Sequence, residues 1–429
     1  MLAKRKVLNN AKWIIICKVI QAVLQLVIGM LCARYLGKSN YGLINYAASI
    51  VAFVLPLMQL GLPSTLVQEL TEAPEDEGKI MGTSLVMSLV SSVACIFLVG
   101  GFVTLTSASD TEKIIVCILY SASLIFRAFE VFQCWFQFKL LSKLPSIMML
   151  VSYVVVSAYR VFLLITQKGI FWFSVVNSID FGIIGISLIF LFCKHSEHKL
   201  AFDIKYVKVL FDRSKFYIIA AMMVTIFQNT DHIMLTNIRD DAENGIYTAA
   251  VTCATVAQFV YIAFIDSMRP VILAHKKDGN TEGYENNLSR LYSVIIYTSV
   301  AQAVCFTIFA KLIISILYGD DFMASIPVLR ILVWYMVFAC LGSVRNVWIL
   351  AENKQSMLWK INLAGALLNV GMNFALIPIM GASGAALATL ATQIFTNFIL
   401  GFIVKPLRIN NKLLLKGLNP KHLLEIVKK

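Results

Sequence analysis

The chain has 429 residues, of which 59% are hydrophobic and 14% are charged, and its mean hydropathy is +0.78. Apolar runs of roughly 20 residues, the length that crosses a bilayer as a helix, recur from end to end and exclude an ordinary soluble domain. The net charge of +13 lies largely in the linkers between these runs. That distribution indicates orientation in a membrane, so nucleic acid binding is not expected.

Hydropathy predicts an all-α polytopic membrane protein with twelve transmembrane helices. The predicted spans are residues 12–35, 41–62, 80–104, 114–138, 146–166, 169–192, 216–238, 245–270, 291–317, 327–351, 361–380 and 383–404. The start MLAKRK is followed by no small-x-small cleavage site, so the first span is expected to be retained.

Basic residues gather in every second linker. Counting Lys and Arg, about 25 lie in the linkers on the side of the two termini and about 5 lie in the links on the other side. The positive-inside rule therefore predicts that both termini lie in the cytoplasm.

The longest internal linker, residues 193–215, divides the predicted spans into two lobes of six helices each. The N-terminal lobe is residues 1–192, the C-terminal lobe is residues 216–404, and residues 405–429 form a basic cytoplasmic tail. A weak repeat relates NYGLINYAAS in the second span to NGIYTAAVT in the eighth. Two repeats of the same orientation place a substrate site between the halves.

Ionisable residues inside the spans are the candidate site residues, because a charge that faces lipid costs roughly 2.5–3.5 kcal/mol on the insertion scale. The basic residues predicted to line a cationic cavity are Lys18, Arg34, Arg127, Arg160 and Arg345. The acidic residues predicted as possible ion-coupling groups are Asp231, Glu130, Asp180 and Asp266. A spacing of three also lets Arg127 pair with Glu130, and Asp266 with Arg269.

The seventh span carries the polar stretch FQNTDHIML, which includes Asp231 and His232. Two hypotheses stand for Asp231. It lines the space between the lobes, where it binds a coupling ion or pairs with a base, or it makes a helix-packing hydrogen bond. The lone His232 and the amides of the eleventh span, Asn362, Asn369 and Asn373, are interpreted as packing residues.

A cationic excess in a water-filled cavity predicts an anionic substrate, because guanidinium groups bind phosphate through parallel hydrogen bonds. The sequence has no P-loop, no Gly-x-Gly-x-x-Gly, no nucleophile elbow and no His-Glu-x-x-His. The nine cysteines show no paired metal-ligand spacing. We therefore expect neither catalytic residues nor a cofactor nor a metal centre.

Four blocks of the sequence carry a resemblance to a known family. They are ARYLGKSNYGLINYAASIVAFVLPLMQLGLPSTLVQEL at 33–70, DHIMLTNIRDDAENGIYTAA at 231–250, ILYGDDFMASIPVLRIL at 316–332 and NFALIPIMGASGAALATLATQ at 373–393. In this order they resemble the polysaccharide flippases of the multidrug, oligosaccharidyl-lipid and polysaccharide exporter superfamily, especially the Wzx-type O-antigen flippases. Asp231, Met234 and Leu235 match that family's Asp-x-x-Met-Leu pattern.

The resemblance implies a V-shaped MATE-like fold and a function. The implied task is to carry an undecaprenyl-pyrophosphate-linked oligosaccharide, of O-antigen or capsule type, from the inner to the outer leaflet of a bacterial cytoplasmic membrane. The implied partners are membrane lipids, a glycan polymerase with its chain-length machinery, and H+ or Na+ as the coupling ion. The alternatives are a multidrug or cation antiporter of the same superfamily and, less favoured, a membrane glycan polymerase or acyltransferase.

Overall fold

The computed structural model describes the backbone of residues 2–420 and the side chains of residues 24–420. Throughout these residues the chain is helical between short turns and linkers, and none of them forms a strand. Nine helical stretches of the described residues are long and apolar enough to cross a membrane. Two of them, Leu24–Gln59 and Ser356–Ile403, each include residues of two predicted spans. An all-helical membrane fold is thus confirmed.

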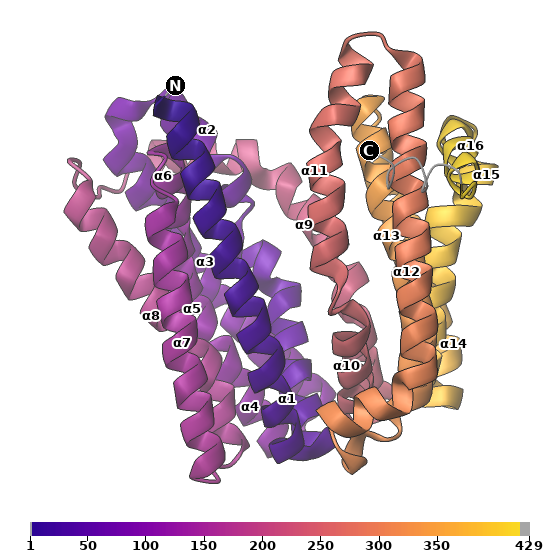
Figure 1. The fold of residues 1–429 in the computed structure, drawn as a ribbon. Coiled ribbons are helices and arrows are strands. Elements are labelled where there is room, and N and C mark those ends of the chain that lie inside the picture. Colours follow the sequence, from indigo (N-terminus) through magenta and orange to yellow (C-terminus); the bar gives the residue numbers. More distant parts are fainter. Residues whose placement is uncertain (1, 421–429) are drawn as a thin grey trace. The chain divides into compact units, whose positions relative to one another are not determined.

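The chain separates into two compact units, residues 1–229 and residues 230–429. The first unit contains α1 (Leu2–Gln59), α2 (Leu66–Glu72), α3 (Glu77–Thr106), α4 (Thr111–Ser121), α5 (Ser123–Arg127), α6 (Val131–Phe138), α7 (Lys143–Ile165), α8 (Ile170–His195) and the first part of α9 (Ile204–Ile238) (Figure 1). The first predicted span and most of the second lie in α1, which breaks at Gly37 with a φ of 70°. Glycine tolerates this left-handed conformation, which a residue with a Cβ rarely adopts.

The second unit contains the end of α9 and seven further α-helices. They are α10 (Asp241–Thr255), α11 (Gln258–Lys277), α12 (Thr281–Leu317), α13 (Ser325–Ala351), α14 (Ser356–Ile394), α15 (Leu400–Ile403) and α16 (Arg408–Gly417). In Figure 1 this unit runs from rose through orange to yellow, with α11 and α12 forming a long hairpin. The predicted eleventh and twelfth spans both begin in α14, which breaks at Gly381.

Each unit has its own apolar core and also exposes large apolar side chains. In the first unit, the Trp135 ring meets the Phe192 ring edge to face at a centroid distance of 4.9 Å. In the second unit, Tyr292 and Trp348 are fully buried. Side chains such as Phe97 and Ile379 are nevertheless 76% exposed. Such exposure suits helices whose outer surface meets lipid, because lipid chains solvate apolar groups.

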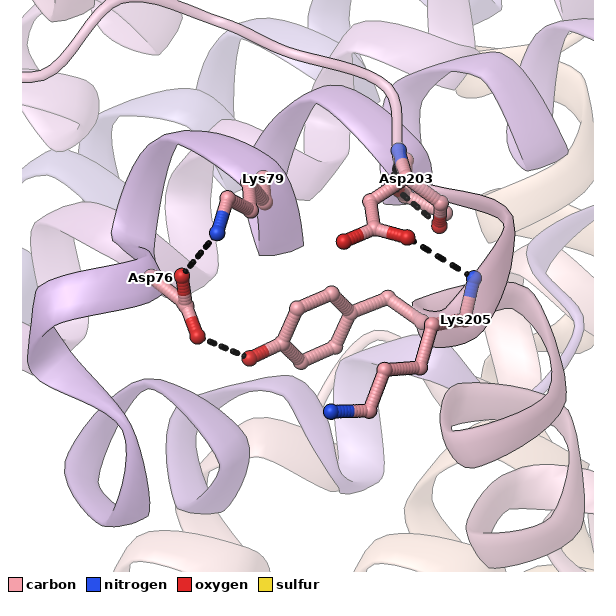
Figure 2. A network of polar contacts seen from close by, with 6 residues as sticks. Asp76, Lys79, Asp203 and Lys205 are labelled. Carbon is pink, nitrogen blue, oxygen red and sulfur yellow. Dashed lines mark hydrogen bonds and ion pairs between the residues drawn. The ribbon is translucent and has the colours of Figure 1, made fainter.

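The linker that leads into α9 lies against the ends of α2 and α3. One carboxylate oxygen of Asp76 lies 2.7 Å from the ammonium of Lys79 (Figure 2). The other accepts a 2.6 Å hydrogen bond from the hydroxyl of Tyr206. The bond to Asp76 raises the pKa of Tyr206 to about 12. Asp203 donates its backbone N–H to the hydroxyl of Thr83 at 3.0 Å. These contacts hold the linker and the start of α9 against the start of α3.

A second set of contacts holds the start of α9 to α2. The guanidinium of Arg213 lies 2.6 Å from the carboxylates of both Glu69 and Glu72. Burial raises the pKa of Glu69 and the charge of Arg213 opposes this rise, whereas the hydrogen bond from Arg213 lowers the pKa of the exposed Glu72. Because a buried carboxylate needs a partner, Arg213 fixes the position of α9 against α2.

Candidate functional site

Arg127 and Glu130 form an ion pair in the first unit, at the junction of α5 and α6. The Nε of Arg127 lies 3.4 Å from Oε2 of Glu130, and each side chain is 19% exposed. The guanidinium also lies over the ring of Phe181 on α8, 4.3 Å from its centroid. This is the ion pair that the spacing of three residues indicated, and a cation–π contact strengthens it in an apolar setting.

Asp180 on α8 lies within electrostatic range of three other predicted charged residues, Arg127, Glu130 and Arg160. Its Oδ1 accepts a 2.7 Å hydrogen bond from the hydroxyl of Ser152 on α7. The charges of Arg160 and Arg127 both act on the Asp180 carboxylate, and the charge of Asp180 acts on Glu130. We call these four residues the arginine–carboxylate cluster: Arg127, Glu130, Arg160 and Asp180.

The arginine–carboxylate cluster has two fixed cations and two carboxyl groups. The hydroxyls of Tyr120 on α4 and Tyr153 on α7 lie within the electrostatic reach of Arg160. An incoming phosphate can replace a carboxylate as the guanidinium's partner, because each presents two oxygens that accept parallel hydrogen bonds from its N–H donors. The cluster can therefore bind an anion if the carboxyl groups move away or become protonated.

A second polar cluster lies in the second unit around Asp231, which is 5% exposed. Its Oδ2 accepts a 2.6 Å hydrogen bond from the hydroxyl of Tyr247 on α10, and its Oδ1 accepts a 2.6 Å bond from Nδ2 of Asn373 on α14. The hydroxyl of Thr389, later in α14, also donates to Oδ2. We call these residues the Asp231 cluster: Asp231, Tyr247, Asn373 and Thr389.

The three hydrogen bonds that the Asp231 carboxylate accepts come from neutral donors. Within the part of the chain that the structure describes, no lysine or arginine forms an ion pair with it. Hydrogen bonds to an ionised carboxylate are about twice as strong as bonds between neutral groups, but they do not neutralise its charge. A proton or a small cation would neutralise it.

The side-chain amides of Asn369 and Asn373 extend the hydrogen-bond network around the carboxylate. Asn369 accepts a 3.1 Å bond from Asn373 and donates to the hydroxyl of Thr389 at 3.5 Å. Oδ1 of Asn373 is buried and has no hydrogen-bond partner among the described residues. Buried polar atoms are nearly always satisfied, so an orphaned amide oxygen beside a carboxylate suits a proton carrier or a small cation.

His232 takes a packing role, as the sequence indicated. Its Nδ1 lies 2.7 Å from Oδ1 of Asn244, and its ring meets the ring of Tyr247 edge to face at 5.1 Å. The imidazole thus packs against the ring of Tyr247, whose hydroxyl bonds to Asp231.

Three other predicted residues, Arg34, Asp266 and Arg345, belong to neither cluster. Arg345 on α13 is 6% exposed and donates a 2.8 Å hydrogen bond to the carbonyl of Thr396. Arg34 is exposed on α1. Asp266 is exposed on α11 and forms a 2.8 Å ion pair with Arg269, the second pair that a spacing of three indicated. Lys18 falls outside the residues whose side chains the structure describes.

Several residues of the clusters escaped the sequence reasoning. Thr389 and Tyr247 are ordinary helix residues, and nothing in their local sequence marks them as partners of Asp231. Asn373 was interpreted as interhelical packing, and its buried bond to Asp231 confirms an interhelical contact. One sequence feature could have identified all three residues as candidates. They lie in two of the blocks that carry the family resemblance, 231–250 and 373–393, and these two blocks contact each other in the structure.

Comparison with known proteins places the chain in a family. The sequence model of the family described as "Polysaccharide biosynthesis protein" matches residues 7–276. An uncharacterized membrane protein of Methanocaldococcus jannaschii, MJ1068, is 28% identical over 226 residues. That match covers 50% of this chain and 42% of the relative, so the chain corresponds to less than half of that protein's length.

Two solved structures share the fold. An inward-facing multidrug resistance MATE family transporter of the MOP superfamily matches with a TM-score of 0.68 and 13% identity, over 92% of this chain and 96% of its own. The lipid II flippase MurJ, in an inward closed conformation, matches with a TM-score of 0.68 and 18% identity, over 94% and 90%. The chain therefore belongs to the polysaccharide biosynthesis protein family and has the fold of the MOP superfamily transporters.

Proposed function

We propose that this chain is a flippase that moves an undecaprenyl-pyrophosphate-linked oligosaccharide across a bacterial cytoplasmic membrane. The substrate enters from the inner leaflet and leaves in the outer leaflet, and the protein alternates between two access states without covalent chemistry. Family membership supports a role in polysaccharide biosynthesis, and the fold supports transport. O-antigen or capsule repeat units are the proposed cargo, which a glycan polymerase and chain-length machinery then receive.

The observation that supports the substrate class is that the charges of two arginines, Arg127 and Arg160, both act on the carboxylate of Asp180, while Arg127 also pairs with Glu130. Two guanidinium groups at one place suit a pyrophosphate, which has several oxygens for parallel N–H donors. The carboxyl groups of Glu130 and Asp180 then act as placeholders that balance the charge before the substrate arrives. Lys18, Arg34 and Arg345 remain candidates for the cationic path along which the substrate moves.

The drive is proposed to be an H+ or Na+ gradient that acts through the Asp231 cluster. A buried carboxylate without a basic partner gains more from a proton or a small cation than an exposed one does. Glu130, Asp180 and Asp266 are further proposed coupling groups, of which Glu130 and Asp180 share their site with the arginines. Both termini are proposed to lie in the cytoplasm, as the distribution of basic residues predicts.

A drug or cation antiporter is the second candidate, favoured by the equal number of cations and carboxyl groups in the arginine–carboxylate cluster. Gene deletion in the host separates the two. For a flippase, we expect surface polysaccharide to be lost and the lipid-linked repeat unit to accumulate inside the cell. Unchanged surface polysaccharide, no accumulation and altered drug susceptibility would favour the antiporter and contradict the flippase.

A further inference from the structure

The break in α14 leaves backbone groups without partners inside the helix. Pro378 has no N–H to donate, and Gly381 has φ 53° and ψ −131°, so the regular ladder of hydrogen bonds stops there. Two carbonyls before the break, those of Ile377 and Pro378, lie at the end of one helical part. The N–H of Ala382 lies at the start of the next. Such groups need other partners.

Two charged side chains supply these partners. Arg239, just beyond the end of α9, donates to the carbonyl of Ile377 at 3.1 Å and to that of Pro378 at 2.5 Å. Glu243, in the first turn of α10, accepts from the N–H of Ala382 at 2.6 Å. Each charge suits its position, because a helix C-terminus attracts cations and an N-terminus attracts anions. We call Arg239 and Glu243 the α14 clamp.

The break itself requires glycine at position 381 for two reasons. A Cβ there would overlap the carboxylate of Glu243. The positive φ is also strained for any residue with a side chain. The clamp and the break therefore depend on one another.

The Asp231 cluster draws its donors from both sides of this break. Asn373 precedes Gly381 in α14 and Thr389 follows it, yet both donate to the same carboxylate. The clamp residues continue the same segment that supplies the acceptor and the third donor: Arg239 follows Asp231 after α9 ends, and Glu243 lies one turn before Tyr247 in α10. The angle between the two parts of α14 thus sets the geometry around Asp231.

We infer that Arg239 and Glu243 are positioning residues for the Asp231 cluster: by holding the two parts of α14 at a fixed angle, they keep Asn373 and Thr389 within bonding distance of the carboxylate. The inference rests on the proposed role of Asp231 as the ion-coupling site. The charged segment that connects α9 to α10 would then also maintain the geometry of the ion-binding site.

The test uses purified full-length protein and measures its melting temperature in a NaCl titration against choline chloride and in a pH titration. The Asp231-dependent response is the part that Asp231→Asn removes. If the ion is Na+, we expect Glu243→Ala to raise the half-maximal NaCl concentration roughly tenfold. If the ion is H+, we expect it to shift the midpoint of the pH response by a roughly tenfold change in H+ activity. Either change corresponds to ~1.4 kcal/mol. Glu243→Gln keeps an oxygen acceptor for Ala382 and should restore most of the response.

Two control variants repeat the same kinds of substitution away from α14. Glu282→Gln removes an exposed carboxylate from the first turn of α12, and Arg330→Lys changes an exposed arginine on α13 that also donates to a carbonyl. Both should keep the wild-type midpoint. A folded Glu243→Ala protein with the wild-type midpoint would overturn the inference. If Glu243→Ala does not fold, Arg239→Lys is used in its place. Lysine keeps the positive charge but cannot make the pair of hydrogen bonds to the carbonyls of Ile377 and Pro378. An unchanged midpoint in this variant would also overturn the inference.

Failure of the proposed coupling has a different signature. If wild type and Asp231→Asn respond equally to NaCl and to pH, then Asp231 does not bind the ion. Amide hydrogen exchange at residues 382–386 then tests the clamp directly, with faster exchange expected in Glu243→Ala and unchanged exchange counting against it. The two results are therefore separable.

Discussion

Replacing Asp231 with Asn is expected to abolish the ion dependence of export and to reduce export at least about tenfold at equal protein level. Asparagine neither binds a proton nor carries the charge that attracts a cation, and its NH2 group would face the three donors that now reach the carboxylate. Export is measured as surface polysaccharide in a deletion strain that expresses the variant, with and without a collapsed H+ or Na+ gradient.

Asp266→Asn is the matched control in the same unit. Asp266 is exposed and already paired with Arg269, so its loss removes only a surface ion pair of small energetic value. We expect near wild-type export with the usual ion dependence. Full export by Asp231→Asn, with an unchanged dependence on the gradient, would end the coupling hypothesis and leave Asp231 as a helix-packing residue.

Replacing Arg160 with Ala is expected to reduce export more than about tenfold while the protein level in the membrane stays constant, because one of the two guanidinium groups proposed to bind pyrophosphate is lost. Arg160→Lys should retain part of the activity, since lysine keeps the charge but not the parallel donors. Wild-type export by Arg160→Ala would remove this residue from substrate binding.

Arg127 and Arg345 require different controls because each has a structural partner. Arg127→Ala leaves Glu130 without its cation, so the informative comparison is the double variant with Glu130→Gln, which removes both charges.

Arg345→Ala leaves the carbonyl of Thr396 without its donor and is expected to lower stability by roughly 1–3 kcal/mol. Loss of export in that variant without loss of protein would point to a substrate contact.

Hydropathy predicted the helices because each span is a long apolar run, and that signal is local. The ion pairs of Arg127 with Glu130 and of Asp266 with Arg269 were also predictable, since the partners lie one helical turn apart. The joining of two predicted spans in α14 is a matter of local backbone geometry: the chain reverses at Gly381 within a single residue of non-helical conformation.

The surroundings of Asp231 were not predictable from one sequence. Its partners Asn373 and Thr389 lie 142 and 158 residues away. No periodicity or spacing rule reaches across such separations. The same limit applies to Arg160 and Asp180, which come together only because α7 packs against α8. The sequence therefore pointed to the charged residues of the sites, whereas the fold determined which of them meet.

The most direct test of the flippase proposal is translocation in vesicles that contain only the purified protein. A fluorescently labelled undecaprenyl-pyrophosphate-linked oligosaccharide is placed in one leaflet, and its appearance in the other is followed with a membrane-impermeant quencher under an imposed H+ or Na+ gradient. We predict gradient-dependent translocation by the wild-type protein and none above protein-free vesicles for Arg160→Ala. Vesicles that contain folded wild-type protein but translocate no faster than protein-free vesicles, with every gradient tested, would contradict the proposed function.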